Sequence, residues 1–158
     1  MLSEVAALLD AWIIDQNVGL RREGLPTYQP CQIQVLGQTA LLEAGLALQL
    51  VATKDVDVRA NYEQAVEAEF HRLLRARGRE LDPVGHEAWM PKETTYAPLY
   101  AGRFVTLLLA DADAVLVSKA LKAPAKNRSL LTEYLAKGAS PRFLQLSKRY
   151  GIDLEQFV

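Results

Sequence analysis

The chain has 158 residues, half of them apolar and 23% charged, with a formal net charge of −1. These values exclude a disordered or low-complexity chain, and the length is that of one domain whose core needs no disulfide or structural metal. No apolar run is long enough to span a membrane, and the N-terminus lacks the basic region of a signal peptide. The single Cys31 forms no internal disulfide, which fits a reducing compartment. We therefore expect a cytoplasmic protein with no membrane partner.

Charge is distributed unevenly along the chain. Residues 1–114 carry 16 acidic and 10 basic side chains, whereas residues 115–158 carry 3 and 8. An acidic half that faces a basic half would suit a cleft with a metal on one wall and phosphates on the other. A solvated helical face explains the same pattern equally well.

Apolar periodicity and turn residues predict the elements of the first half. Ser3 is a candidate cap for the first helix and Asn61 for the third, and Gly37 ends the first strand. In chain order we expect a helix over 3–16, a loop over 19–30, a strand over 32–36, a helix over 38–50, a strand over 53–59 and a helix over 61–78.

The second half is predicted to begin with short strands and to end in helices. Asp111 and Asp113 precede one of these helices as caps, and Ser140 with Pro141 opens another. We expect strands over 80–81 and 86–90, a loop over 91–102, a strand over 104–109, helices over 114–123, 127–137 and 141–150, and a last turn from residue 153.

These elements predict an α/β (α+β) fold, in which a small mixed sheet of about four strands is flanked by helices. A single domain covers residues 1–158, with the sheet-containing core in 1–115 and a helical C-terminal tail in 116–158 packed on it.

Two carboxylates, Asp55 and Asp57, are separated by one apolar residue in a strand pattern, which turns both to the same face of the sheet. Like charges so close repel each other. A shared divalent cation would offset the repulsion, and carboxylate oxygens are suitable ligands for it. Two acids on a solvated edge are the alternative.

Residues 35–40 (Val-Leu-Gly-Gln-Thr-Ala), the helix after them and residues 54–58 (Lys-Asp-Val-Asp-Val) together resemble the minimal nucleotidyltransferases of the DNA polymerase β superfamily. The pattern there is a strand, a Gly that opens a helix, and Asp-x-Asp on the next strand. Within that superfamily, the chain is most similar to the bacterial branch related to abortive-infection toxins and toxin–antitoxin modules.

The resemblance implies transfer of a nucleoside monophosphate from an NTP to a hydroxyl on RNA or on a partner protein, such as a toxin or antitoxin. Asp55 and Asp57 would bind Mg²⁺ or Mn²⁺. Glu87 would be the third catalytic acid, with Asp111 as the other candidate. The residues implied in nucleotide binding are Gly37, Gln38, Thr39, Lys54 and Lys119.

Two other functions stay open. The family has Gly or Ser where this chain has Gln38, and neither candidate third acid matches clearly, which favours a catalytically decayed protein that acts as a binding or antitoxin-like module. The third function is nucleic-acid binding through the C-terminal helices, against which stands a solvated helical bundle. The residues that could contact nucleic acid are Tyr134, Arg142, Lys148, Arg149 and Tyr150.

Overall fold

The computed structural model describes every residue from Met1 to Val158. Its centre is a five-stranded mixed sheet in the order β3-β2-β1-β5-β4. β1 pairs with β5 and β2 with β3 in parallel, whereas β1–β2 and β4–β5 are antiparallel. This confirms the predicted α/β fold with a mixed sheet. The strands are β1 (Cys31–Leu36), β2 (Asp55–Ala60), β3 (Glu80–Leu81), β4 (Tyr96–Ala101) and β5 (Val105–Ala110).

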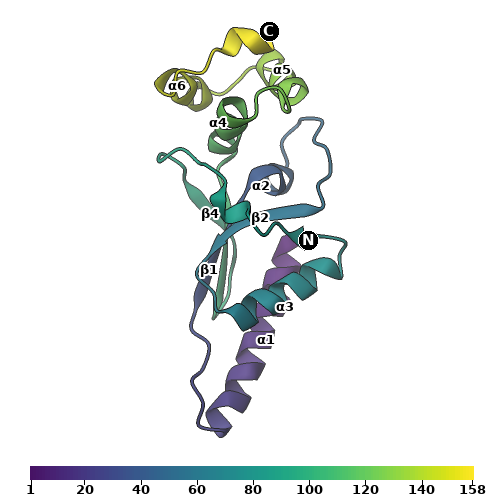
Figure 1. The fold of residues 1–158 in the computed structure, drawn as a ribbon, viewed down its shortest axis with the longest axis vertical. Helices are drawn as coiled ribbons and strands as arrows, with labels where there is room; N and C mark the ends of the chain where they lie inside the picture. The colour runs from purple at the N-terminus through teal and green to yellow at the C-terminus, as the bar shows by residue number, and fades with distance from the viewer.

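Two helices, α1 (Leu2–Arg22) and α3 (Gln64–Arg75), lie side by side on one face of this sheet (Figure 1). Alternate strand residues such as Ile33 and Val56 are fully buried in the core beneath them. Because side chains alternate along a strand, Asp57 and Arg59 point to the opposite face. The core therefore lies on one side of β2, and the side chain of Asp57 lies on the other.

The C-terminal helices lie beyond one end of the sheet, with α5 and α6 farthest from the α1–β1 loop (Figure 1). They are α4 (Ala112–Lys122), α5 (Arg128–Ala136) and α6 (Pro141–Arg149), followed by the 3-10 turn η2 (Leu154–Phe157), and they form the predicted helical tail. The short helix α2 (Gly37–Ala44) and the 3-10 turn η1 (Gly85–Glu87) contact β2 instead.

Helix boundaries differ from the prediction for identifiable reasons. α1 continues past residue 16, and its cap position is Met1, because the Ser3 hydroxyl bonds to Leu99 instead. α2 ends at residue 44 because Gly45 adopts a left-handed conformation, so residues 46–50 are not helical. Asn61 does not cap α3, since its side chain accepts the Gln32 amide from β1.

The segment between β3 and β5 was predicted wrongly in two places. Residues 86–90 are not a strand, and β4 lies within the stretch expected to be a loop. β4 carries Pro98, which has no amide to donate, but its position at the sheet edge makes this tolerable. The predicted caps at Asp111 and Ser140 are confirmed, since each accepts a backbone amide at the start of its helix. Asp113 does not cap α4, because it lies in the first turn of that helix and its carboxylate accepts from Tyr134 and Ser140. The last turn begins at Asp153 as predicted, and this residue caps it.

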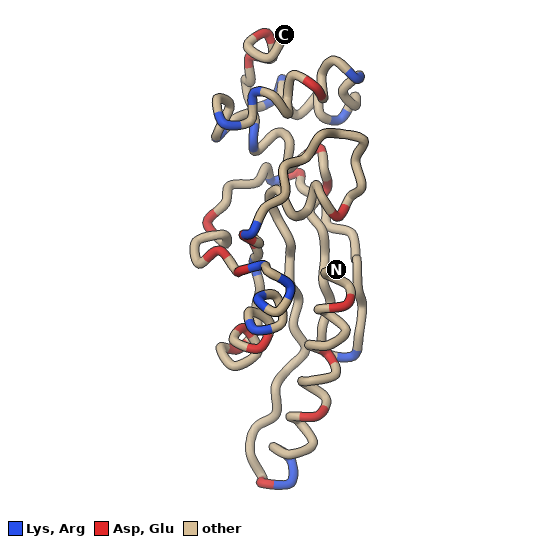
Figure 2. Tube along the Cα trace, turned by 90° about the vertical axis from the view of Figure 1, so that its right-hand side faces the viewer, with Lys and Arg blue, Asp and Glu red and all other residues tan.

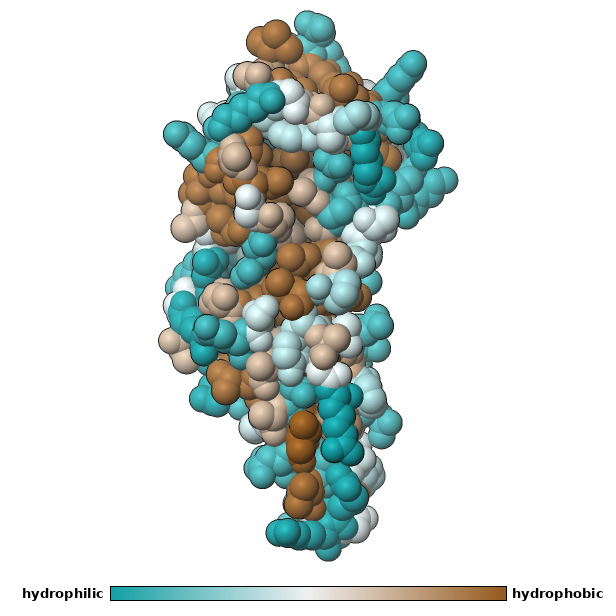
Figure 3. Space-filling model, turned by 180° about the vertical axis from the view of Figure 1, so that it is seen from behind, coloured by the Kyte–Doolittle hydropathy of each residue, from teal (hydrophilic) through white to brown (hydrophobic).

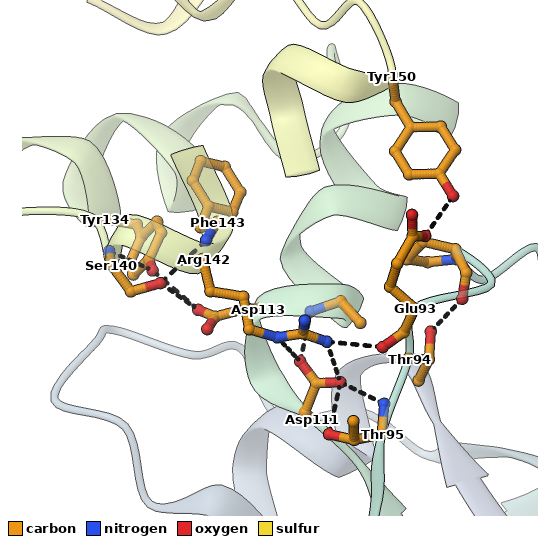
Figure 4. Close-up of polar contacts among 12 residues, drawn as sticks. Glu93, Thr94, Thr95, Asp111, Asp113, Tyr134, Ser140, Arg142, Phe143 and Tyr150 are labelled. Atoms are coloured by element: carbon orange, nitrogen blue, oxygen red, sulfur yellow. Dashed lines mark hydrogen bonds and ion pairs between the residues drawn. The ribbon is translucent and has the colours of Figure 1, made fainter. Parts of the chain in front are cut away.

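Basic residues concentrate in the C-terminal helices, above the sheet in Figure 2. Several of them have partners within the chain (Figure 4). Arg142 bonds to the Asp111 carboxylate and the Glu93 carbonyl. Arg149 pairs with the Glu93 carboxylate at 2.5 Å, and Tyr150 donates to the same carboxylate. These contacts fasten α6 to the segment before β4.

Four of the five residues considered for nucleic-acid contact are thus engaged internally, because Tyr134 also donates its hydroxyl proton, to Asp113. Only Lys148 is exposed without a partner. These contacts favour the solvated helical bundle over nucleic-acid binding through these five residues.

Apolar surface is limited at the α1–β1 end, where the view from behind shows a narrow apolar stripe between polar residues (Figure 3). None of the helices combines the length and the apolar character required to cross a bilayer.

The Glu93 contacts predict a pH dependence of stability. The hydrogen bonds from Tyr150 and Arg149 lower the pKa of Glu93 to about 2, so its charged form stabilises the fold above the ordinary carboxyl pKa. This contribution is lost as the pH falls from about 4.5 towards 2. We expect Glu93→Gln to be less stable than the native chain at pH 6, with the difference shrinking at pH 3. Urea unfolding at both values measures it, and Glu23→Gln, at an exposed acid, is the control.

Candidate functional site

The candidate site is built around Asp57, whose half-buried carboxyl group lies between two glycines. A Cβ added to Gly37 would lie 2.5 Å from Oδ2 of Asp57, and one added to Gly85 would lie 2.9 Å from Oδ1. Both carboxylate oxygens are therefore enclosed by backbone that has no side chain. The site needs glycine on both sides of this acid.

Gly37 is required for a second reason. It opens α2 directly after β1 with φ +63°, a left-handed conformation that is strained for any residue with a Cβ. Register places the preceding residue, Leu36, opposite Asp57. The sharp turn thus directs the start of α2 towards the carboxylate.

The acid nearest to Asp57 is Asp82, which the sequence reasoning missed. β2 and β3 are parallel, with Asp55 opposite Glu80 and Val56 opposite Leu81. The amide of Asp82 continues this ladder by donating to Val56 O at 3.0 Å. The next step along the register therefore brings Asp82 beside Asp57. An acid directly after a short strand was the available signal, but the pairing partner of that strand was not readable from sequence.

Burial raises the pKa of Asp57 to about 6, helped by a hydrogen bond to Asp82 and by the charges of Asp82 and Asp55. Lys119 acts in the opposite direction. The pair Asp57–Asp82 is therefore a place where a proton or a cation is favoured over two bare negative charges.

The other predicted site residues lie at different distances from this centre. Asp55 is exposed at the start of β2, and the buried Thr39 donates to its carbonyl at 3.3 Å, so Thr39 positions the strand. Lys54 lies 3.8 Å from Glu80 in an exposed ion pair at the sheet edge. Lys54 therefore has a structural partner of its own.

The two candidates for a third acid are not brought to the pair. Glu87 is 69% exposed, and its carboxylate lies 3.9 Å from the His86 imidazole, away from the pair. Asp111 caps α4 and binds Arg142, and these bonds lower its pKa although burial opposes them. The position of Glu87 does not support its predicted catalytic role, and the acid that lies beside Asp57 is Asp82.

A cavity of about 360 Å³ lies between α4, α5 and the loop after α2. Gln38 lines it and donates to Val51 O at 3.0 Å, which holds the loop against the start of α2. Gln38 thus shapes a cavity wall. The polar residues around it are Gln38, Gln49, Thr53, Lys119, Lys126, Asn127 and Ser129.

Two lysines, Lys119 and Lys126, give this cavity a positive wall. Burial lowers the pKa of Lys119, the neighbouring Lys126 lowers it further, and Asp57 opposes both. Lys119 therefore lies within electrostatic reach of both the cavity and the acidic pair. An anion in the cavity would relieve the repulsion between the two lysines.

The two carboxylates of Asp57 and Asp82 have the donor chemistry for a magnesium ion that is shared with a substrate. No three His, Cys, Asp or Glu side chains are close enough together to hold a metal by themselves. Magnesium is commonly bound by one or two carboxylates plus substrate phosphates and water, so Asp57 and Asp82 would suffice as protein ligands.

The enclosure of Asp57 makes Gly37 sensitive to substitution. Gly37→Ala would combine left-handed strain with the contact to Oδ2, and we expect a loss of about 2–3 kcal/mol in unfolding free energy. Gly45→Ala is the matched control, because Gly45 has φ +66° but no atom within 4 Å of the added Cβ. Its cost should be the strain alone, about 1 kcal/mol. If Asp57→Ser does not reduce the extra cost at Gly37 in a double-mutant cycle, the contact is not its cause.

The raised pKa of Asp57 predicts that this acid destabilises the fold at neutral pH. The folded chain binds more protons than the unfolded one between about pH 4 and 6, so stability falls as the pH rises through that window. Asp57→Asn should therefore stabilise the chain at pH 7.5 by about 1–2 kcal/mol, discounted for partial exposure, and by less at pH 4. Thermal unfolding at both values tests this. The control is Asp15→Asn on the exposed face of α1, and an equal gain at both pH values would contradict the assignment.

Comparison of the chain with models of protein families, with curated proteins and with solved structures found no match in any of the three.

Proposed function

We propose that this protein is a magnesium-dependent nucleotidyltransferase, which moves a nucleoside monophosphate from an NTP to a hydroxyl group on RNA or on a protein. The observation that carries the proposal is the Asp57–Asp82 pair beside the glycine-opened start of α2, with Lys119 between that pair and a cavity. Acids and lysines on opposite walls are what a metal-bound polyphosphate requires.

The substrate is positioned by the charges of the two walls. The phosphates lie between the acidic pair and the Lys119–Lys126 wall, and the amides at the start of α2 face them. The cavity of about 360 Å³ lies within the range of small-molecule sites and takes the nucleoside. Leu130 and Val51 supply its apolar surface, and the amide side chains around it supply hydrogen bonds.

The reaction is a displacement at the α-phosphorus. The acceptor oxygen forms a bond to that phosphorus as its bond to the bridging oxygen breaks, and pyrophosphate leaves. Magnesium, when bound, neutralises phosphate charge and favours ionisation of the attacking hydroxyl. Asp57 and Asp82 would hold the ion, and we assign Asp82 to accept the proton of the attacking hydroxyl. Lys119 balances the charge of the leaving pyrophosphate.

A binding module of the same fold is the second candidate. The enclosure of Asp57 by Gly37 and Gly85 favours it, because the carboxylate as arranged leaves little room for a metal. A module of this kind would bind an anion at the lysine wall without turnover.

One set of variants separates the two candidates. We expect calorimetry with each NTP and Mg²⁺ to show binding to the native chain, and radiolabelled NTP to label RNA or protein acceptors. Lys119→Met should weaken NTP binding by roughly ten- to a hundredfold, the effect of one charge-assisted hydrogen bond. Asp82→Asn should bind NTP but transfer at least about a hundredfold more slowly.

Matched controls are the exposed Lys148→Met and Asp15→Asn, which should change neither quantity. NTP binding that needs Lys119 but never leads to transfer would select the binding module. Absence of NTP binding to the native chain would reject both candidates.

A further inference from the structure

Residues 83–91 form a strap that leaves β3 at one edge of the sheet and leads to β4 at the other. It crosses the face of β2 that carries Asp57, where its turn η1 packs on β2. A Cβ on Gly85 would lie 2.8 Å from the Asp57 Cα, so the strap backbone rests directly on the strand. The strap covers the Oδ1 side of the Asp57 carboxylate.

The middle of the strap buries almost nothing. Its residues Pro83, Val84, His86 and Glu87 are exposed, and Gly85 is the residue that is buried. The ends are fastened: Asp82 continues the ladder with Val56, and Pro91 is buried beside the half-buried Trp89. The middle can therefore lift without exposing an apolar side chain or opening the core.

Hydrogen bonds from outside hold the strap at its start, its middle and its end. At the start, the Val84 amide donates to Asp82 Oδ1 and the Gly85 amide to Asp82 O, each at 3.0 Å. Arg59 of β2 donates from Nε to His86 O at 3.1 Å and from Nη2 to Ala88 O. Ser118 of α4 donates to Trp89 O at 2.5 Å, at the fastened end. Arg59 makes no ion pair, and both of its hydrogen bonds go to carbonyls of the strap.

We infer that the strap is a gate over Asp57 and that Arg59 is its latch. With the gate closed, Asp57 is enclosed between Gly37 and Gly85. When the Arg59 bonds break, residues 83–87 lift, and the Oδ1 side of Asp57 becomes open to an acceptor. The purpose of the gate rests on the proposed function, but its movement can be measured without any substrate.

The test uses a cysteine as a reporter of access. Native Cys31 is 4% exposed, and burial raises the pKa of its thiol to about 11, so it contributes little background. A thiol reagent should label Asp57→Cys at least about tenfold more slowly than Asp55→Cys, which lies two residues away and is exposed. Adding Arg59→Met should speed labelling at position 57 about fivefold or more and leave position 55 unchanged.

Arg79→Met is the matched control, since Arg79 also donates to a backbone carbonyl, that of Thr53, away from the strap. It should leave the rate at position 57 unchanged. Equal labelling of positions 57 and 55 in the otherwise native chain would overturn the gate. An unchanged rate at position 57 after Arg59→Met, or rates that rise together at both positions, would overturn the latch.

A second measurement needs no cysteine variant. The amides of Glu87 and Ala88 donate within the strap, and that of Gly85 donates to Asp82 O at its start. Hydrogen exchange at these three amides should be faster than in β5 and should rise further in Arg59→Met. Exchange as slow as in β5 would show that the strap opens only on global unfolding and would overturn the gate. Because neither measurement uses nucleotide or metal, a working gate in a chain without transferase activity would reject the proposed function and leave the gate standing.

Discussion

The confinement of Asp57 is the constraint on which the arrangement of the site depends. The pairing of β2 with β1 sets Asp57 opposite Leu36, and the next residue must then turn sharply into α2 without a side chain. The same strand pairs in parallel with β3, which delivers Asp82 to the same point. A central acid, a glycine-opened helix and a second acid thus all follow from the pairing of β2.

Confinement of a charge has an energetic consequence that links fold to function. A carboxylate that is half-buried beside a second one is less stable when ionised, and the raised pKa of Asp57 expresses this. A stable fold alone gains nothing from such a pair, because an apolar residue would pack there without the penalty. The penalty becomes useful when a cation binds, since the repulsion is then converted into affinity. Lys119 compensates the charge only in part, as it faces the cavity and Lys126 as well.

The C-terminal helices are joined to this centre through polar contacts at two places. Glu133 of α5 accepts the Gln49 amide from the loop after α2, which closes one side of the cavity. At the second place, Glu93 accepts hydrogen bonds from Arg149 and Tyr150, and Asp111 accepts them from Arg142 (Figure 4). These bonds hold α6 against the segment that follows the strap. The basic composition of the tail is therefore largely used in assembly. Lys126 in the cavity wall and Lys148 on α6 make no such contact.

Much of the local structure was predictable because it depends on neighbours in sequence. Gly37 between an alternating strand and a helix, the Asp55–Asp57 alternation on β2, and the caps at Asp111 and Ser140 are signals of a few residues each, and the structure confirms these elements and caps. Helix ends were less predictable, since Gly45 stops α2 although the apolar pattern continues beyond it.

Contacts between distant segments were decided by the tertiary structure alone. Asp82 joins Asp57 because two strands pair in parallel, and neither strand carries a local mark of its partner. Residues 86–90 have the composition of a strand, but Arg59 takes two of their carbonyls and holds them as a strap. The sequence by itself determined the acidic alternation of β2 and the starts of the helices capped by Asp111 and Ser140, because these features depend on residues close together in the chain. Which acids meet, which lysine faces them and what covers them depend on long-range packing, which composition and spacing do not encode.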